Sequence, residues 1–506
     1  MSTNTSEFEM KLLFPEDKLQ AIEKFIVSKG GIRRQHLQAI YIDTPDFLLT
    51  QAGIAFRLRK EGRQWIQTLK VSTSNPLERL EHNITLSTMG SAIPHWDIEL
   101  HQAHEAGHLL MKRLPELQTK NLQASYQTDI WRRKVLVRTR QGLLEYALDL
   151  GFIQVNQPTG ATKTVVQELE IELKEGSPSQ VLLHAENMIK RYKAYIDTQS
   201  KSERGYLLAR NLQASPPVRA KSVSLKKMHG DRGAINLLIH SCLSQVLPNQ
   251  SVLNSEAVNP SEYLHQLRVG LRRLKVLLKY LARHDIFIGE EGLEVFKKTF
   301  DALGEYRDSD YLTGVLNPIL LSLGGPEIKL AAIQDLPNPS HITRDTEFQL
   351  LLIELMSLGI PPVDESHEGK GAQENSAAIK KTAVKLLNSA FHFIADRASR
   401  FSVLNDEEIH TLRKKMKFMR YSLEFFRDYC DKKQYSKFFK SISITLDHLG
   451  LFNDICVSIN RIEGLTEDDQ TLLFALGWLK AERQRVRSLC EKSVKKLVQN
   501  ELVWGS

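Results

Sequence analysis

The chain has 506 residues, of which 42% are hydrophobic and 25% charged. This length exceeds what one hydrophobic core can organise and predicts about two to four domains, and the ordinary globular composition excludes a disordered or fibrous chain. With 68 Lys and Arg against 60 Asp and Glu, the net charge of +8 favours a polyanionic ligand, whether nucleic acid, a phosphate chain or an acidic membrane face.

The cysteines and the amino-terminal segment bear on the compartment. Cys242, Cys430, Cys456 and Cys490 are far apart and form no C-x-x-C pair, which predicts free thiols in a reducing compartment. The amino terminus is polar and acidic, and nowhere do 18 uninterrupted apolar residues occur. We therefore expect no signal peptide, no membrane span and a cytoplasmic protein.

The strand pattern begins near the first residue, in the stretch SEFEMKLL at residues 6–13. In an extended strand, Glu7, Glu9 and Lys11 share one face while apolar side chains occupy the other. Two carboxylates at this spacing suit a hard divalent cation, and the lysine suits a phosphate or a neighbouring carboxylate. By itself the pattern more often marks a solvated strand face, so its meaning depends on the later strands.

A helix and a meander of strands follow. Apolar side chains at helical spacing predict a helix over 15–29, and Gly30 and Gly31 end it. Period-two patterns then predict strands, interrupted by a helical segment over 101–114. The predicted strands cover 35–43, 54–60, 64–71, 79–86, 129–138, 144–151 and 165–176.

Charged or polar side chains recur at every second position of these strands. They are Arg57, Arg59, Thr68, Lys70, Arg79, Glu81, Asn83, Arg132, Lys134, Asp149, Glu168, Glu170 and Glu172. Unpaired buried charges cost several kcal/mol each, so a dry core cannot hold this set. A closed or nearly closed barrel would instead form a tunnel in which the bases hold phosphate oxygens and the acids hold metal ions. The alternative is a set of independent solvated strand faces.

A series of short motifs resembles the CYTH family of triphosphate tunnel metalloenzymes. The motifs are the first E-x-E-x-K, YIDTPD (41–46), FRLRK (56–60), QTLK (67–70), ALDLG (147–151), ELEIEL (168–173) and SKSERGY (200–206). Their order and spacing both agree with the family over about residues 1–210. The resemblance implies a closed eight-stranded antiparallel β-barrel that acts on triphosphates with Mg²⁺ or Mn²⁺.

The resemblance also implies roles for individual residues. The implied metal ligands are Glu7, Glu9, Glu168, Glu170 and Glu172, and the implied triphosphate ligands are Lys11, Arg57, Arg59, Lys70, Arg132, Lys134 and Lys201. Glu81 and Asp149 are similar to further tunnel acids, so the catalytic set comprises Glu7, Glu9, Lys11, Glu81 and Asp149. The residues do not indicate which acid takes a proton from water.

Beyond the strands the composition changes. Residues 212–223 contain Pro216 and Pro217 among serine, alanine and basic residues, which predicts an extended linker between domains. Apolar residues then recur every three or four positions, so the rest is predicted to be all helical. The polar stretch 361–376 is predicted to be a mobile loop.

The helical half contains an internal repeat. HQLRVGLRRLKVLLKYL from His265 matches HTLRKKMKFMRYSLEFF from His410 at a constant offset of 145 residues. Further along the chain, an offset of 146 residues pairs Gly304 with Gly450 and Asp308 with Asp454. In each copy, basic residues form one helical stripe opposite an apolar face. The stripe residues are His265, Arg268, Arg272 and Lys275 in the first copy and His410, Arg413, Lys417 and Arg420 in the second, with Arg273 and Lys414 as further basic candidates beside them.

A basic stripe on one helix is commonly a solvated face, but two related stripes resemble the CHAD family of helical domains. This resemblance covers about residues 224–500 and implies that inorganic polyphosphate binds along the basic surface. We therefore expect an α+β multidomain chain: a tunnel domain over 1–211, a linker over 212–223 and an all-α domain over 224–500, with two duplicated helical-bundle halves at about 224–360 and 377–500.

The leading functional hypothesis is a metal-dependent hydrolase of inorganic triphosphate with a polyphosphate-binding helical domain. One alternative makes the whole protein a non-catalytic polyphosphate-binding or targeting factor. Another keeps an enzyme but changes its substrate to thiamine triphosphate, or to ATP cyclised to cyclic AMP. Nucleic acid is disfavoured because no aromatic residues interleave with the basic ones.

Overall fold

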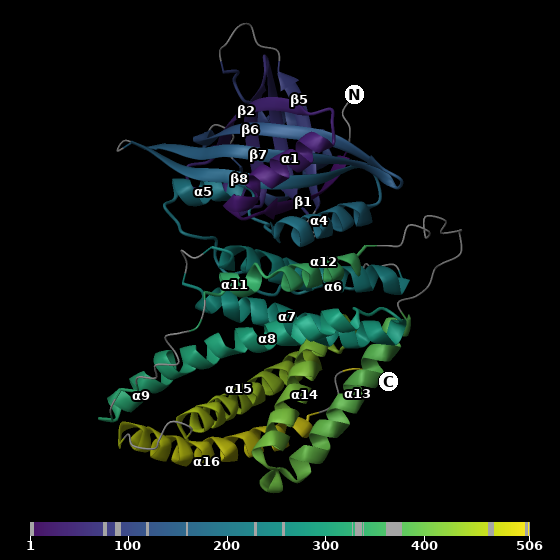
Figure 1. Ribbon diagram of the computed structural model, residues 1–506. Coiled ribbons are helices and arrows are strands. Elements are labelled where there is room, and N and C mark those ends of the chain that lie inside the picture. Colours follow the sequence, from purple (N-terminus) through teal and green to yellow (C-terminus); the bar gives the residue numbers. More distant parts are fainter. Residues whose placement is uncertain are drawn as a thin grey trace. The chain divides into compact units, whose positions relative to one another are not determined.

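A computed structural model describes residues 5–73, 78–86, 93–117, 121–157, 160–226, 230–255, 259–325, 327–328, 336, 338–360, 377–463, 470–500 and 504 (Figure 1). The chain forms two compact units. The first comprises Met1–Arg219, Leu243–Gln266 and Pro339–Val363, and the second comprises Ala220–Cys242, Leu267–Asn338 and Asp364–Ser506.

An antiparallel sheet of nine strands forms the centre of the first unit. Its strands are β1 (Thr5–Leu13), β2 (Arg33–Asp43), β3 (Ile54–Glu61), β4 (Gln64–Ser72), β5 (Glu78–Leu86), β6 (Gln123–Thr139), β7 (Gly142–Gln157), β8 (Gly160–Gly176) and β9 (Tyr195–Ile196). All the predicted strands are present, and several are longer than their local pattern indicated. The strands β6, β7 and β8 extend to 16 or 17 residues because each pairs with its neighbour almost end to end.

The strand order is β5-β4-β3-β2-β6-β7-β8-β1-β9, and β5 has an additional pairing with β1. In that pairing the backbone of Glu7 lies opposite Arg79. The expected count of eight strands is wrong, because β9 adds a ninth by pairing with β1 at Leu12 and Leu13. This two-residue strand carries no alternating pattern of its own, so local sequence could not indicate it.

Side-chain alternation separates an apolar outer face of the sheet from a charged inner one. Met10 and Leu12 are fully buried on one side of β1, while Glu9 and Lys11 lie on the other. Outside β3 and β4, the helix α3 (Glu105–Arg113) contributes Ala106 and Leu110 to a buried apolar cluster. The core of this unit therefore lies between the sheet and the helices that cover its outside.

The remaining helices of the first unit are short. They are α1 (Leu19–Ser28), α2 (Leu48–Gln51), α4 (Pro178–Tyr192), α5 (Lys201–Ala209), α11 (Ser340–Thr343) and α12 (Thr346–Ser357), with 3₁₀ turns η1 (Glu16–Lys18) and η2 (Ile98–His101). The predicted first helix is confirmed as α1. Helix α4 was not predicted, although Ser177 caps it and Pro178 occupies its first turn, a combination typical of a helix start. It packs against β8 and β1 (Figure 1).

Residues 212–223, the predicted linker, are all described and contain neither helix nor strand. The first part of this segment is nevertheless held in place within the first unit. Asn249 binds both the N–H and the C=O of Val218, at 3.1 and 2.8 Å, and the Tyr263 hydroxyl donates to the Ser215 carbonyl at 2.8 Å. These contacts make it an ordered strap, since its backbone polar groups have fixed partners.

The rest of the described chain is helical, as predicted. Its helices are α6 (Gly230–Leu253), α7 (Ser261–Leu281), α8 (Glu290–Tyr311), α9 (Asn317–Ser322), α13 (Ala377–Ser399), α14 (Asp406–Phe425), α15 (Lys432–Glu463) and α16 (Gln470–Val498), with short turns η4 (Ala282–His284), η5 (Leu312–Leu316), η7 (Phe401–Val403) and η8 (Arg427–Tyr429). The first unit includes the end of α6 and the start of α7. The predicted mobile loop at 361–376 lies outside the described residues.

The internal repeat is visible in how two arginines pack. A Cβ built on Gly304 would lie 3.6 Å from the Arg268 guanidinium, and one built on Gly450 would lie 3.8 Å from that of Arg413. Both arginines are only 8% exposed. The paired sequence positions therefore make the same arginine-on-glycine contact in both copies.

Two expectations about compartment can be compared with the structure. The four cysteines are free thiols, as predicted. Within the described residues, one helix, α15, has the length and apolar composition of a membrane span, a property that core helices of globular proteins share. Helix α15 lies in the second unit, where it buries Phe438, Ile442 and Leu449. Its apolar face therefore contributes to a core.

Candidate active site

A cavity of about 1070 Å³ lies within the first unit, against the charged face of the sheet. Every residue predicted to bind metal or phosphate in this domain lines it, as do Glu81 and Asp149, except Glu7, whose side chain lies outside the described residues. The lining set is Glu9, Lys11, Arg57, Arg59, Lys70, Glu81, Arg132, Lys134, Asp149, Glu168, Glu170, Glu172 and Lys201.

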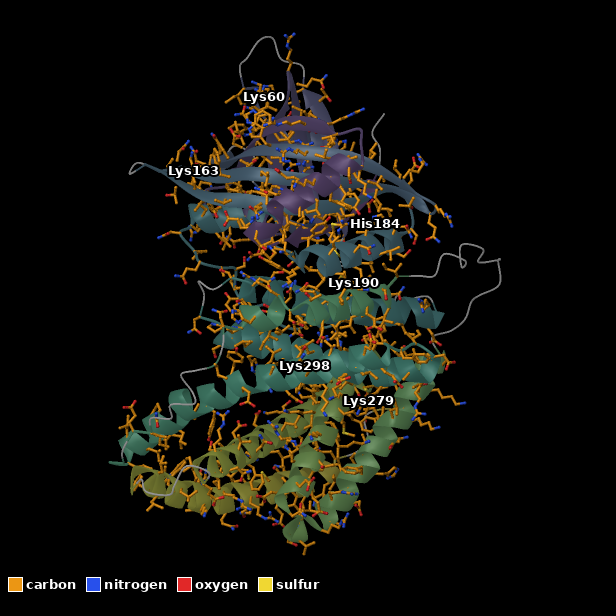
Figure 2. All side chains as sticks on the ribbon, in the orientation of Figure 1. Lys60, Lys163, His184, Lys190, Lys279 and Lys298 are labelled. Carbon is orange, nitrogen blue, oxygen red and sulfur yellow. The ribbon has the colours of Figure 1, made fainter. Side chains whose placement is uncertain are left out.

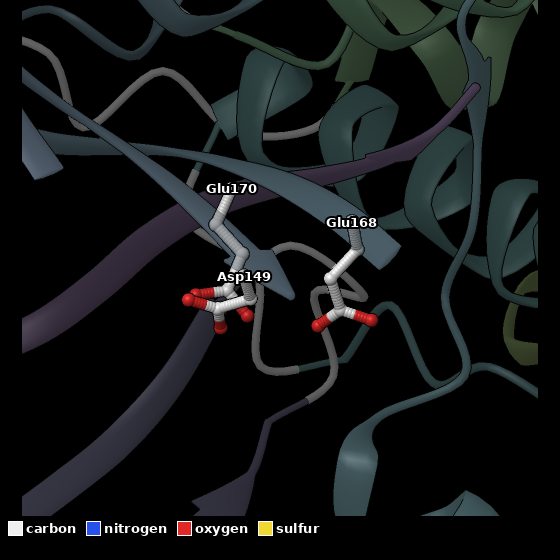
Figure 3. A group of neighbouring side chains, drawn as sticks. All are labelled: Asp149, Glu168 and Glu170. Carbon is white, nitrogen blue, oxygen red and sulfur yellow. The ribbon is translucent and has the colours of Figure 1, made fainter. Parts of the chain in front are cut away.

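The inner part of the cavity contains three carboxylates around one ammonium group. Asp149 on β7 and Glu168 and Glu170 on β8 point to the same side (Figure 3). The Lys201 Nζ lies 2.8 Å from an oxygen of Asp149 and 2.8 Å from one of Glu170, and it also contacts Glu168. Arg132 binds Asp149 with two hydrogen bonds of 2.7 Å and Glu170 with one of 2.5 Å. We name these three acids the inner carboxylates.

Burial and charge act in opposite directions on the inner carboxylates. Burial opposes ionisation of Glu170, but the charges of Lys201 and Arg132 outweigh it and hold its pKa well below the ordinary value. Burial likewise opposes the charge on Lys201, and the surrounding acids raise its pKa despite that. The cluster is therefore an ionised network already neutralised by cations of the protein.

Lys201 reaches the inner carboxylates because α5 packs closely against the sheet. A Cβ on Gly205 would lie 2.2 Å from the Tyr126 ring, so only glycine allows α5 to reach this depth. The Tyr126 hydroxyl also donates to the Ser202 carbonyl at 2.9 Å. The SKSERGY motif thus combines the lysine with the glycine that lets its helix approach.

A second row of acids crosses three neighbouring strands. Glu9 on β1 lies opposite Glu172 on β8, which lies opposite Glu145 on β7. We name these three the outer carboxylates. Their cationic partners are Arg79 at 3.6 Å from Glu9, Lys174 at 2.5 Å from Glu172, and Lys134 at 3.3 Å from Glu145. Burial, with Glu145 nearby, raises the pKa of Glu172 despite Lys174, so this row can still accept positive charge.

Basic side chains lie on β3 and β4 and face the same cavity. Lys70 pairs with Glu81, which also accepts a hydrogen bond of 2.7 Å from Asn83. Arg57 donates to the Tyr41 hydroxyl at 3.1 Å, and Arg59 contacts Glu61 at 2.5 Å. These cations and the carboxylates face one cavity, which suits a ligand with negative charges bridged by cations.

Sequence reasoning missed several residues that belong to this site, and four of them show why. Tyr41 and Glu145 occupy inward positions of predicted strands, so the period-two rule could have included them. Arg204 contacts Glu168 from α5, one helical turn after Lys201, and helical spacing could have found it. Asp197 binds Lys11 at 3.2 Å from a segment with no local signal.

Both acidic groups offer the oxygen ligands that Mg²⁺ and Mn²⁺ prefer, so the donor set fits a hard divalent cation. The ligand atoms of the inner carboxylates lie within 4.8 Å of one another. Their cations are largely buried, with Lys201 only 12% exposed, whereas Lys174 beside the outer carboxylates is 34% exposed. A metal ion would therefore displace cations from the outer group more easily than from the inner one.

Comparison with known proteins agrees with this arrangement. Residues 5–206 match the CYTH domain and residues 237–463 match the CHAD domain. The chain carries a CYTH domain followed by a CHAD domain.

Individual relatives add detail. An inorganic triphosphatase from Haemophilus influenzae is 29% identical over 207 residues, which are 40% of this chain and 54% of that relative. The match therefore spans about half of the relative's length. A solved CHAD domain from the plant Ricinus communis is 20% identical with a TM-score of 0.45, covering 57% of this chain and 99% of that one. A Hippeastrum protein, studied as an adenylyl cyclase and having a dominant triphosphatase activity, is 13% identical with a TM-score of 0.28, covering 41% and 97%.

In the CHAD domain, only part of the predicted basic stripe reaches the surface. His265, Lys275 and Lys414 are exposed, whereas Arg273 is 2% exposed and binds the Ser241 carbonyl and hydroxyl at 3.2 and 3.0 Å. Arg273 therefore joins α7 to α6 and lies away from the surface on which it was predicted. Arg268, Arg272 and Lys275 converge over the Phe300 ring, at 5.2, 5.7 and 5.8 Å.

The corresponding stripe of the second copy has a different environment. His410 and Arg413 line a pocket of about 350 Å³ together with Asp406 and Glu407. The ring of His410 shares a hydrogen bond of 2.6 Å with Asn453. Lys417 and Arg420 are partly buried on the same helix, and Arg420 contacts Glu424 at 3.2 Å. The second histidine therefore lies in a pocket that also contains acids.

Proposed function

We propose that the CYTH domain hydrolyses inorganic triphosphate with the help of Mg²⁺ or Mn²⁺, and that the CHAD domain binds inorganic polyphosphate. The observation that carries the first part is the single cavity in which basic side chains of β3, β4, β6 and α5 face carboxylates of β1, β7 and β8. The likeness to an inorganic triphosphatase over the same residues supports it.

The sheet of nine strands supports a tunnel, rather than the expected closed eight-stranded barrel, as the form of this site. β5 also pairs with β1, so strands from opposite parts of the order are neighbours. Charged residues on a ring of strands can surround a ligand from all sides.

We assign the triphosphate to the basic residues Lys11, Arg57, Arg59, Lys70, Arg132, Lys134 and Lys201. The side chain that can orient terminal phosphates most freely is Arg57, because its partner is the Tyr41 hydroxyl, whereas Arg59 pairs with Glu61 and both Arg132 and Lys201 pair with the inner carboxylates. A fixed set of cations would stabilise the charge that moves to the leaving phosphate. In this scheme the carboxylate of Asp149 fixes the positions of Arg132 and Lys201, and that of Glu81 fixes the position of Lys70.

We assign the divalent ion to the outer carboxylates, with Glu9 and Glu172 as its main ligands and Glu7 beside them on β1. Glu168 and Glu170 remain candidates, but buried cations compete for them. When bound, the ion supplies neutralising charge to phosphate oxygens and polarises the attacking water. The residues of the chain hold the phosphate chain in line with that attack.

Two other substrates remain alternatives. ATP or thiamine triphosphate would also need a surface for an aromatic base or ring. Among the described residues, the aromatic side chains that line the cavity are Tyr41 and Tyr206, and the hydroxyl of Tyr41 is bound to Arg57. This lining favours a bare phosphate chain. A polyphosphate-binding protein without catalysis is the alternative from another class.

The test measures phosphate release from triphosphate, ATP, thiamine triphosphate and long polyphosphate, with Mg²⁺ or Mn²⁺ and with EDTA. We expect triphosphate to be the preferred substrate, EDTA to abolish release, and Glu9→Gln to lower kcat/KM by at least about 100-fold, as loss of a metal ligand implies. Glu186→Gln, which removes an acid of α4 paired with Lys190 at 2.5 Å, is the matched control. Activity that survives EDTA and Glu9→Gln would contradict the proposal.

We also propose a reducing compartment such as the cytoplasm. The support is that the cysteines are free, because an oxidising compartment favours paired ones.

A further inference from the structure

The short strand β9 forms an edge of the sheet. Among the described strands its neighbour is β1, through the pairs Leu12 with Ile196 and Leu13 with Tyr195. On its other side, the backbone N–H and C=O of an edge strand need partners, because buried polar groups without hydrogen bonds are costly. Ile196 is 1% exposed, so water does not serve them.

Two glutamine side chains take the place of a neighbouring strand. The Ile196 N–H donates to Gln349 Oε1 at 2.8 Å, and Gln250 Nε2 donates to the Ile196 carbonyl at 2.8 Å. Gln349 Nε2 also donates to Gln250 Oε1 at 3.2 Å, which links the two amides. Both glutamines are completely buried. They come from α12 and α6, and the stretch that matches the CHAD domain contains both.

Further polar groups at and just beyond the end of α6 extend this contact. Asn254 Nδ2 donates to the Ile196 carbonyl at 3.2 Å, and the Thr198 N–H donates to Ser251 Oγ at 3.0 Å. We name Gln250, Ser251, Asn254 and Gln349 the amide clamp. It holds the outer edge of a segment whose Ile196, Asp197, Thr198 and Lys201 all line the cavity.

The inner edge of the same segment is bound to Lys11. The Asp197 N–H donates to the Lys11 carbonyl at 3.1 Å, and the Asp197 carboxylate lies 3.2 Å from Lys11 Nζ. Asp197 is 4% exposed. A shift of Ile196 therefore moves Asp197, and with it the counter-ion that sets the position of the Lys11 ammonium.

We propose that the amide clamp positions the triphosphate site: Gln349 and Gln250 fix the backbone of Ile196, and thereby fix Asp197 and Lys11. This inference rests on the proposed function, because it concerns the same cavity. The clamp residues do not themselves line the cavity and act on it through Ile196 and Thr198, so they are positioning residues. The consequence is that tunnel geometry depends on residues of the CHAD-matching stretch.

The competing explanation is that these amides only stabilise the fold. Gln245 provides a matched comparison, because it lies on the same helix, is 1% exposed, and bonds through its side-chain amide to Gln266 at 3.0 Å. The amide of Gln245 thus joins α6 to α7, since Gln266 lies on α7. Gln245→Leu should therefore lower stability in the same way as Gln349→Leu without moving the segment 196–201.

The experiment compares the full chain with Gln349→Leu and Gln245→Leu. We expect Gln349→Leu to raise the KM for triphosphate at least about tenfold more than Gln245→Leu at equal losses of Tm, since displacing a positioned group by ~1 Å can cost about 100-fold. Ser251→Ala, a milder change, should give a smaller rise. Hydrogen exchange should become faster at the Ile196 and Thr198 amides in Gln349→Leu alone.

The outcomes separate the two ideas. Equal KM values for Gln349→Leu and Gln245→Leu, with wild-type turnover intact, would overturn the positioning role and leave the proposed function standing. If the wild-type chain neither hydrolyses triphosphate nor binds it in calorimetry with tripolyphosphate, the proposed function fails and the positioning role fails with it. Faster exchange at Ile196 without any change in KM would also overturn the role.

Discussion

At the scale of single residues, the ammonium of Lys201 occupies a position between three acids. The contacts with Asp149 and Glu170 measure 2.8 Å, and the side chain is 12% exposed. Removing one member of a buried ion network leaves the others uncompensated, which costs more than the pair itself contributes. Lys201 therefore has a structural role that is independent of any phosphate ligand.

We predict that Lys201→Met lowers the free energy of unfolding by about 3 to 5 kcal/mol, because Glu168 and Glu170 lose a shared buried partner. Urea denaturation followed by circular dichroism measures the change. Lys174→Met serves as control: Lys174 pairs with Glu172 at 2.5 Å but is 34% exposed, so its loss should cost less than about 1 kcal/mol. Similar effects of the two substitutions would refute the distinction between inner and outer carboxylates.

At the scale of elements, three histidines attach η2 and α3 to the outside of the sheet. His101 is fully buried and shares a hydrogen bond of 3.0 Å with His82, whose ring stacks on His104 at 4.2 Å. Gln67 Nε2 lies 3.1 Å from His101 Nε2, and the same amide nitrogen donates to the Asp97 carbonyl. Because an amide N–H faces Nε2, this nitrogen must accept, and the ring is neutral.

This arrangement predicts a loss of stability in mild acid. Burial, with His82 and His104 nearby, lowers the His101 pKa from 6.5 to about 3. The unfolded chain takes up a proton below about pH 6.5 and the folded chain does not, so the contribution is complete above 6.5 and is lost as pH falls from 6.5 towards 3. The slope is about 1.4 kcal/mol per pH unit.

Unfolding by urea between about pH 7 and pH 5 tests this linkage. We expect His101→Gln to start from a lower stability but to lose less of it on acidification, since glutamine takes up no proton in this range. A wild-type protein and a His101→Gln variant with parallel pH profiles would show that the histidine does not contribute.

The strands could be predicted from the sequence because side-chain direction in a strand alternates with a fixed period of two. This pattern therefore placed Glu9, Lys11, Arg57 and Lys134 on one face before any pairing was known. The sequence pattern could not predict a role for Asp197, because the pairing of β9 with β1 is what brings that carboxylate to Lys11.

Neither could local pattern tell which acids are already neutralised. That depends on Arg132, Lys201 and Arg204 arriving from β6 and α5. The burial of Arg273 in the helical half was hidden for the same reason, since its partner Ser241 lies on another helix.

At the scale of the whole molecule, the net charge of +8 is distributed so that some lysines lack an acidic partner. Lys275 and Lys279 of α7 and Lys415 of α14 have no ion pair within the described part of the chain, and Lys279 is labelled in Figure 2. Burial, with Lys415 and Lys275 nearby, lowers the Lys279 pKa. A bound polyanion would relieve this mutual repulsion.

We predict that Arg272→Ala combined with Lys275→Ala weakens polyphosphate binding and reduces its salt dependence. The slope of log K against log salt should fall in magnitude by about one to two, as two phosphate contacts are lost. Fluorescence anisotropy with a labelled polyphosphate measures this. Lys432→Ala with Lys433→Ala, two exposed lysines at the start of α15, is the control. Equal binding by the two double variants, or loss of triphosphate turnover with unchanged binding, would reverse the assignment of roles.

The sheet unit is built from three separate stretches of the chain, Met1–Arg219, Leu243–Gln266 and Pro339–Val363. The CYTH match ends at residue 206 and the CHAD match begins at 237. A gene recombination with its breakpoint between residues 206 and 237 would therefore transfer the strands of the sheet without Gln250 and Gln349. Selection on α6 and α12 should accordingly reflect the needs of the tunnel as well as those of the helical domain, and the two domains should be inherited together.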